Sequence, residues 1–260
     1  MIKKLALGML SFELAVAAYA ATPGSDNAND PAYVSGWTNG TDGGTAATFG
    51  PWTLTPSPNS TNAGFLIGDS TTLSAGNTGG NINTSGKSFE LFGFDSGGNA
   101  DATRAFDSAL TVGQEFSLDL AVNFLNGVKG FDLLVGTTSK FELNMGNSSY
   151  TVFNSNSNGD IFGDAYSSNT VFHLDFLQTS LTGGTWTITR SGGLTGTATG
   201  TYNGDPTGFH LYDHQTSGGG APEDSLYVNN LLVVPEPTTL SLLVASSLLG
   251  AWFFVRRSRA

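Results

Sequence analysis

Residues 115 to 124 read EFSLDLAVNF, and this stretch decides the fold class. Its apolar and other side chains alternate strictly, with the apolar ones at Phe116, Leu118, Leu120, Val122 and Phe124. Because successive side chains of a β-strand point to opposite faces, this period of two places every apolar group on one face. The stretch therefore predicts a strand with one buried face.

The same alternation recurs further along the chain, at Phe141, Leu143 and Met145, at Phe172, Leu174 and Phe176, and at Trp186 and Ile188. Pairs that favour tight turns, such as Gly192-Gly193 and Asn203-Gly204, lie between these stretches. No segment between residues 35 and 234 shows a sustained helical period. We therefore expect an all-β domain over residues 35–234, an antiparallel two-sheet sandwich or jelly roll of about eleven to fourteen strands.

The composition agrees with a packed domain and excludes several classes of function. The 18 Phe, 7 Tyr and 4 Trp residues supply enough apolar surface for a core, and the absence of cysteine excludes disulfides and thiolate metal sites. Residues 21–234 hold five basic and 19 acidic residues, so the net charge is 5 − 19 = −14. Such a chain repels phosphate backbones, so we expect no nucleic-acid partner, and the sequence indicates no cofactor.

The first 20 residues have the order of features typical of a secretory signal peptide. Lys3 and Lys4 precede an apolar run that ends at Ala18, and Ala18 and Ala20 supply the small side chains that a signal peptidase reads. We expect cleavage before Ala21. Residues 21–34 are rich in Asn, Asp and Pro, and they predict a loose leader ahead of the domain.

The other end of the chain carries a second apolar run. Residues 238–255 contain no charge, and 18 residues at about 1.5 Å of helical rise each span about 27 Å, enough to cross a bilayer. Arg256, Arg257 and Arg259 follow immediately. Arginines at the end of an apolar helix favour the cytoplasmic side, so the sequence predicts a single membrane-spanning helix with the domain outside the cytoplasm.

Pro235-Glu236-Pro237 stands directly before this run, where its prolines favour an extended segment. The tripeptide, the apolar helix and the arginine cluster together resemble the PEP-CTERM sorting signal over residues 235–260. The resemblance implies that an exosortase, a membrane-embedded processing enzyme, recognises Pro235, Glu236 and Pro237, and that the arginines stop transfer. It also implies passage through the inner membrane to the cell surface or an exopolysaccharide matrix.

Few residues within the domain indicate chemistry. Trp37 and Trp52 lie in Gly- and Thr-rich segments and are candidates for stacking on sugar rings, with core packing as the alternative. His210, Tyr212 and His214 are expected to share one strand face, with Asp213 on the other, as a platform for a metal or a sugar or as ordinary packing. The run from Asn154 to Asp160 loosely follows the spacing of a calcium loop, but Ala165 replaces the glutamate that such a loop needs, so a hairpin turn is favoured.

The sequence contains no recognisable catalytic motif. Glu115 and Asp119 would lie roughly 13 Å apart on one strand face, beyond the spacing of a glycosidase pair unless a twist or a third acid intervenes. Glu90, Asp95 and Asp132 would need the fold to bring them together. We therefore expect no enzymatic activity and predict an exported surface protein with a structural or adhesive role. A carbohydrate-binding module and, behind it, a glycan-cleaving enzyme are the alternatives.

Overall fold

The computed structural model describes residues 23–45, 48–57, 62–72, 79–94, 97–122, 127–146, 149–163, 166–214 and 225–234. The predicted signal peptide with Ala18, Ala20 and Ala21, the sorting motif and the arginine cluster lie outside these residues. Within them, no helix has the length and apolar character needed to span a membrane.

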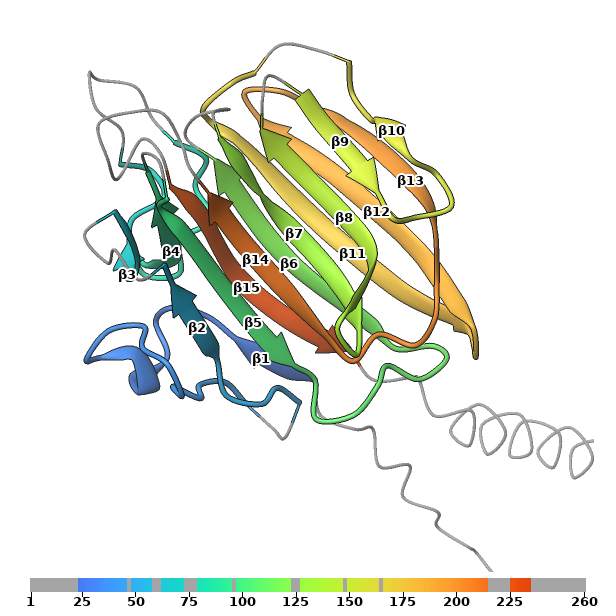
Figure 1. Cartoon of the computed structure of the whole chain (residues 1–260), viewed down its shortest axis with the longest axis horizontal. Helices are drawn as coiled ribbons and strands as arrows, with labels where there is room; N and C mark the ends of the chain where they lie inside the picture. The colour runs from blue at the N-terminus through green and yellow to red at the C-terminus, as the bar shows by residue number, and fades with distance from the viewer. Residues whose placement is uncertain are drawn as a thin grey trace, which may run out of the picture. The chain divides into compact units, whose positions relative to one another are not determined.

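The described strands form two antiparallel sheets that face each other (Figure 1). The eight-stranded sheet follows the order β13-β12-β11-β6-β15-β4-β3, with β1 also paired to β15. Its strands are β1 (Gly24–Asp26), β3 (Ala63–Gly68), β4 (Ser88–Gly93), β6 (Glu115–Val122), β11 (Thr170–Ser180), β12 (Gly183–Gly192), β13 (Gly196–Asn203) and β15 (Leu226–Val234).

The seven-stranded sheet follows the order β10-β9-β8-β7-β14-β5-β2. Its strands are β2 (Thr53–Pro56), β5 (Asn99–Ala105), β7 (Val128–Val135), β8 (Thr138–Gly146), β9 (Ser149–Phe153), β10 (Gly159–Asp160) and β14 (Gly208–His214). One 3-10 turn, η1 (Pro31–Tyr33), precedes β2. The predicted all-β, two-sheet antiparallel sandwich is confirmed.

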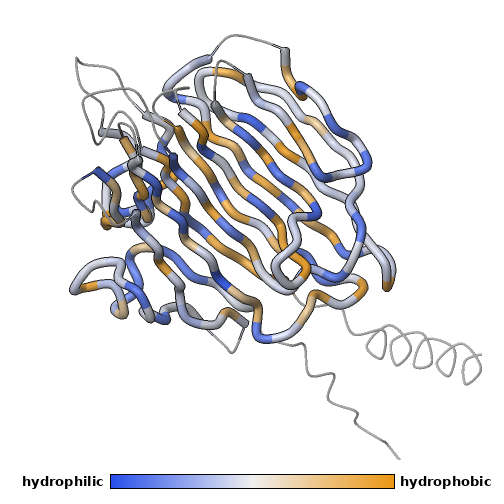
Figure 2. The backbone as a smooth tube through the Cα atoms, viewed as in Figure 1, coloured by the Kyte–Doolittle hydropathy of each residue, from blue (hydrophilic) through white to orange (hydrophobic). Residues whose placement is uncertain are grey.

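The core lies between the sheets and consists of the residues that the alternation placed there. Apolar and polar positions alternate along the strands of both layers (Figure 2). Phe116 of β6 packs against Phe209 of β14 with ring centroids 5.1 Å apart, and Phe131 of β7 packs against Phe176 of β11 at 5.3 Å. Each of these rings is fully buried and contributes about 1.5–3 kcal/mol relative to exposure. Aromatic side chains therefore join the two sheets.

The hairpin between β12 and β13 depends on a glycine. Gly192 has φ = +88°, and a Cβ at this position would lie 2.2 Å from the carbonyl oxygen of Asn169. Both the backbone angle and the contact exclude an ordinary side chain. The Gly192-Gly193 turn expected from the sequence is therefore present, and it places β13 at one edge of the eight-stranded sheet.

Residues 24–33 correct the prediction of a loose leader. β1 pairs with the last strand, with Gly24 opposite Val233 and Asp26 opposite Leu231. The side chains of Asp26 and Tyr33 are buried. The segment is part of the sandwich because its few large or charged side chains find partners far away in the sequence, which local composition does not reveal.

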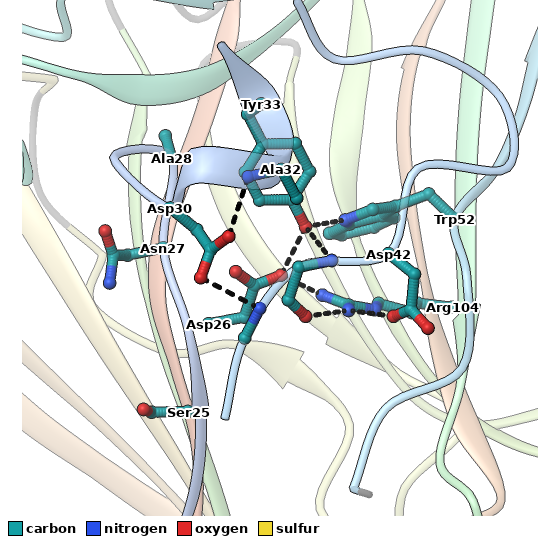
Figure 3. Close-up of polar contacts among 12 residues, drawn as sticks. Ser25, Asp26, Asn27, Ala28, Asp30, Ala32, Tyr33, Asp42, Trp52 and Arg104 are labelled. Atoms are coloured by element: carbon teal, nitrogen blue, oxygen red, sulfur yellow. Dashed lines mark hydrogen bonds and ion pairs between the residues drawn. The ribbon is translucent and has the colours of Figure 1, made fainter. Parts of the chain in front are cut away.

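Those partners are drawn in Figure 3. The buried carboxylate of Asp26 forms an ion pair with Arg104 of β5 and accepts a hydrogen bond from Tyr33. Tyr33 in turn accepts a hydrogen bond from Trp52 Nε1 at 3.1 Å. Asp42, which is about half exposed, approaches the other end of the same guanidinium at 3.2 Å. A buried charge needs such pairing, so this network fixes the N-terminal segment onto the opposite sheet.

Candidate functional site

A row of rings lies on the outer face of the seven-stranded sheet. His210, Tyr212 and His214 alternate along β14, and the centroid of the Tyr212 ring lies 5.6 Å from each imidazole centroid. Asp213 points to the opposite face and is buried, directly across from the buried Lys129 of β7. The shared face that the sequence predicted for the three rings is confirmed.

His210 is held between carboxylates from the two neighbouring strands. Its Nδ1 lies 3.0 Å from Asp132 Oδ2 of β7, and its Nε2 lies 2.9 Å from Asp101 Oδ1 of β5. The same oxygen of Asp101 lies 2.9 Å from His214 Nε2. The strand register produces these contacts. His210 is directly opposite Asp132 of β7. Asp101 of β5 is directly opposite Tyr212, and its carboxylate therefore lies within reach of both histidines that flank Tyr212 on β14.

This arrangement sets the charges of the site. Burial acts to lower the pKa of His210, but the hydrogen bonds to Asp101 and Asp132 outweigh it and raise the pKa to about 9. Burial likewise acts to raise the pKa of Asp101, while the two imidazoles lower it well below its ordinary value. At neutral pH the row therefore contains the His210 imidazolium beside the ionised carboxylate of Asp101.

The hydrogen bonds continue across β8 to the end of β9. Tyr212 donates to Glu142 Oε1 at 3.0 Å and accepts from Asn144 Nδ2 at 3.2 Å. Asn154 donates from Nδ2 to Glu142 Oε2 at 3.1 Å. We call this set the outer-face cluster, and it comprises Asp101, Asp132, Glu142, Asn144, Asn154, His210, Tyr212 and His214.

Chemically, the outer-face cluster offers hydrogen-bond acceptors, donors and ring edges on one face. Asp101 and His214 are more accessible than Asp132 and His210, and each is about one-third exposed. No group of three or more His, Cys, Asp or Glu side chains in the described part of the chain is arranged to hold a metal ion. Carboxylates, amides and rings on a sheet surface are the groups that bind polar, hydroxyl-rich ligands.

A second polar group lies on the outer face of the eight-stranded sheet. His173 of β11 approaches Asp119 of β6 through Nδ1 at 2.6 Å and Asp175 through Nε2 at 3.0 Å. Hydrogen bonds to Asp119 and Asp175 raise the pKa of His173 to about 10. His173 and Asp175 share the outward face of β11, and nearly half of the His173 imidazole is exposed.

Trp37 and Trp52 are not at the surface. Their exposed fractions are 2% and 1%, and their ring centroids lie 5.0 Å apart at 78° in the core. Phe89 of β4 packs against both rings. The prediction that they stack on a sugar is therefore wrong in this fold, and the alternative of core packing holds.

The carboxylates considered for catalysis do not meet. Glu90 and Asp132 belong to different sheets, and their sequence neighbours Phe89, Leu91, Phe131 and Leu133 all point into the core. The two carboxylates therefore lie on opposite outer faces. Asp95 lies outside the described residues. Glu115 and Asp119 share one face of β6, and Asp175 lies between them on β11, directly across from Ser117.

The calcium-like run does not gather its side chains. Asn154 reaches Glu142, Asn156 donates from Nδ2 to Thr201 Oγ1 at 3.1 Å, and Asn158 accepts from the Ser155 amide at 2.9 Å. Their side-chain amides therefore form separate local bonds. The run forms the connection between β9 and β10, as the favoured hairpin interpretation expected.

No protein-family model matches the sequence, and no curated protein matches it either. Solved structures with similar folds include a sialidase, with 12% identity and a TM-score of 0.40, matched over 61% of this chain and 16% of the sialidase.

A second similar structure is described as an endo-acting O-glycanase of human gut microbiota that initiates mucin breakdown. It shows 12% identity and a TM-score of 0.39, over 74% of this chain and 93% of the other. The binding domain of botulinum neurotoxin serotype D has 12% identity and a TM-score of 0.36, over 69% of this chain and 44% of that one. At these scores the likenesses carry no inference about function. The chain's own strands define it as an antiparallel β-sandwich protein.

Proposed function

We propose that this chain is the precursor of an exported surface protein, which an exosortase-type enzyme sorts through residues 235–260 and which acts without catalysis. The observation that carries the proposal is the closure of the sandwich by its own ends. β1 pairs with β15, and the buried core among the described residues runs from Ala28 to Val233. In the sequence, this core lies between the two terminal apolar runs, which have the features of a signal peptide and a membrane-spanning helix.

The chain contains a matched control for the sorting motif. Glu236 follows Pro235, and Glu223 follows Pro222. Glu223 stands 11 residues before Val234, the last residue of β15. Both glutamates precede the apolar run and differ in their flanking residues, since only Glu236 has proline on both sides. Replacing each with glutamine makes the same chemical change in and out of the proposed tag.

We expect Glu236→Gln to accumulate in the inner membrane fraction of the producing bacterium, because the processing enzyme no longer recognises its substrate. Glu223→Gln should reach the surface or the medium like the unmodified protein. Cell fractionation with immunodetection measures this. Equal release of both variants would contradict the role of the tag.

For the sandwich itself, the outer-face cluster favours a second candidate function, the binding of carbohydrate. Its carboxylates and amides present acceptors and donors that suit sugar hydroxyl groups, and its imidazole rings present edges beside them. The net charge of −14 over residues 21–234, from five basic and 19 acidic residues, repels anionic polymers. A neutral polysaccharide is therefore the favoured ligand.

Affinity electrophoresis of the detergent-solubilised chain through gels containing dextran or alginate tests this candidate. We expect a neutral glucan such as dextran to slow the protein, and anionic alginate to have no such effect. His214→Ala should lose the retardation, because it removes an accessible ring of the cluster. His173→Ala, on the other sheet, is the matched control, and equal loss in both variants or no retardation at all would contradict the candidate.

A further inference from the structure

The edges of the two sheets are built differently. A sheet edge offers unpaired backbone groups to other strands, and proteins blunt it with short strands, prolines or charges. In the seven-stranded sheet, β10 has two residues and β2 has four, ending at Pro56. In the eight-stranded sheet, the edge strand β13 runs for eight residues, GTATGTYN, with no charge and no proline. This edge lacks the usual protection.

Two hydrogen bonds show which way the backbone of β13 faces. The amide of Gly204 donates to Thr182 O at 2.8 Å on the β12 side, and Thr201 O accepts from the Asn156 amide at 3.0 Å on the other side. Because both backbone groups of a strand residue point the same way, the even-numbered residues bond to β12 and the odd-numbered ones point outward. Thr197, Thr199 and Thr201 therefore form the outer edge.

Part of this edge is already covered. Asn156 donates from Nδ2 to Thr201 Oγ1 at 3.1 Å, and Asn203 donates from Nδ2 to Asn156 Oδ1 at 2.8 Å, in addition to the backbone bond to Thr201. In the part of the chain that the structure describes, no such bond reaches the outward backbone groups of Thr197 or Thr199. At Thr197 and Thr199 the open edge thus offers two amides and two carbonyls.

We propose that this open edge pairs with the same edge of a second copy of the chain, antiparallel about a two-fold axis at Ala198. In that register Thr197 of one copy lies opposite Thr199 of the other. Each pair exchanges two N–H···O bonds, so the two copies form four bonds and satisfy the amides and carbonyls of Thr197 and Thr199 in both copies. A copy suits the edge because its two donors and two acceptors complement themselves.

Side chains and charge favour the same partner. Within one copy, Thr187 is directly opposite Thr199, and Thr189 is directly opposite Thr197, so threonines already pair across the β12–β13 ladder. Self-pairing continues these rows into the second copy, and cross-strand threonine pairs stabilise sheets. The whole chain has a net charge of −11, yet β13 contributes none of it. Two copies can therefore pair along β13 without repulsion between like charges on that strand.

The mass of the full chain in detergent micelles, measured by size-exclusion chromatography with light scattering, tests the proposal. We expect a dimer for the unmodified chain and a monomer for Thr199→Lys, because the two lysines, each opposite Thr197 of the other copy, would bring like charges close together near the axis. Thr187→Lys makes the same change on the same outer face of an interior strand and should remain dimeric. A monomeric unmodified chain, or the same mass for both lysine variants, would overturn the proposal.

Disulfide trapping provides a measurement that does not depend on the lysine variants folding. The chain contains no cysteine, so Thr197→Cys and Thr199→Cys each add a single thiol. Opposite residues in a bonded antiparallel pair have Cα atoms about 5.5 Å apart, within disulfide range. Mixing the two variants under oxidation should give a covalent dimer, and each variant alone should give far less. Equal cross-linking in all three samples would contradict the register.

Discussion

Asp26 and Arg104 form an ion pair in which both side chains are completely buried. Asp26 belongs to β1 of the eight-stranded sheet, and Arg104 belongs to β5 of the seven-stranded sheet, so the pair joins the two layers. The guanidinium also lies 4.8 Å from the ring centroid of Phe49 and 4.9 Å from that of Trp52. The segment that contains β1 is therefore fixed to the sandwich by an ion pair that water does not reach.

Breaking the ion pair of Asp26 with Arg104 should lower the free energy of unfolding far more than breaking the ion pair of Asp42 with the same arginine. Asp26→Ala leaves a buried guanidinium without its main counter-ion, and we expect a loss of about 3–5 kcal/mol in the free energy of unfolding. Asp42→Ala removes a partner of the same guanidinium that is 53% exposed, and we expect a loss of about 0–1 kcal/mol. Urea unfolding followed by tryptophan fluorescence measures both, and similar losses would contradict this account of the network.

Trp52 should matter to stability and not to ligand contact. Trp52→Ala removes a buried ring and leaves the Tyr33 hydroxyl without its indole donor, and we expect a loss of about 3–5 kcal/mol. Trp52→Phe keeps most of the ring and should unfold at an intermediate urea concentration while retaining any polysaccharide affinity. Loss of that affinity in a fully folded Trp52→Phe variant would show that the indole contacts the ligand after all.

The imidazoles give the sandwich a pH dependence whose sign follows from their pKa values. In the folded chain the pKa of His210 is about 9, against an ordinary value of 6.5. A raised pKa contributes stability that is fully present below pH 6.5 and is lost as the pH rises through 9. Asp101, whose pKa is lowered, stays ionised across this window and contributes constantly.

We therefore expect the free energy of unfolding to fall between pH 6.5 and 9 in the unmodified protein. His210→Gln should reduce this slope. His173 has a pKa of about 10 and contributes a similar fall, so the double variant with His173→Gln should be flatter still. Urea titrations at several pH values measure the slope, and an unchanged slope in the double variant would refute the assigned protonation states.

Much of the fold could be predicted because alternation reports directly which face of a strand is buried. Phe116, Leu118 and Leu120 are fully buried, and β15 ends at Val234, the last residue of the predicted domain. What alternation does not report is which strands are neighbours. Asp101 and Asp132 join His210 only through the register of β5, β14 and β7, so the sequence indicated the ring row but not its carboxylates.

The two predictions that the structure corrects are the loose leader and the exposed tryptophans, and they share one cause. Asn, Asp and Pro around residue 30 and Gly and Thr around the tryptophans are typical of loops, but a loop composition does not imply exposure. In the structure, Tyr33 and Trp37 both pack edge-on or tilted against Phe89 of β4. Irregular segments are buried wherever a few large side chains find a core, and this depends on contacts distant in the sequence.

The central claim is that the sandwich is exported and released from two terminal segments, and mass spectrometry of the protein recovered intact from cells tests it most directly. The account predicts a chain that begins at Ala21 and ends close to Pro235, Glu236 or Pro237, found in the envelope, matrix or medium. A cytosolic product that begins at Met1 and ends at Ala260 would contradict it.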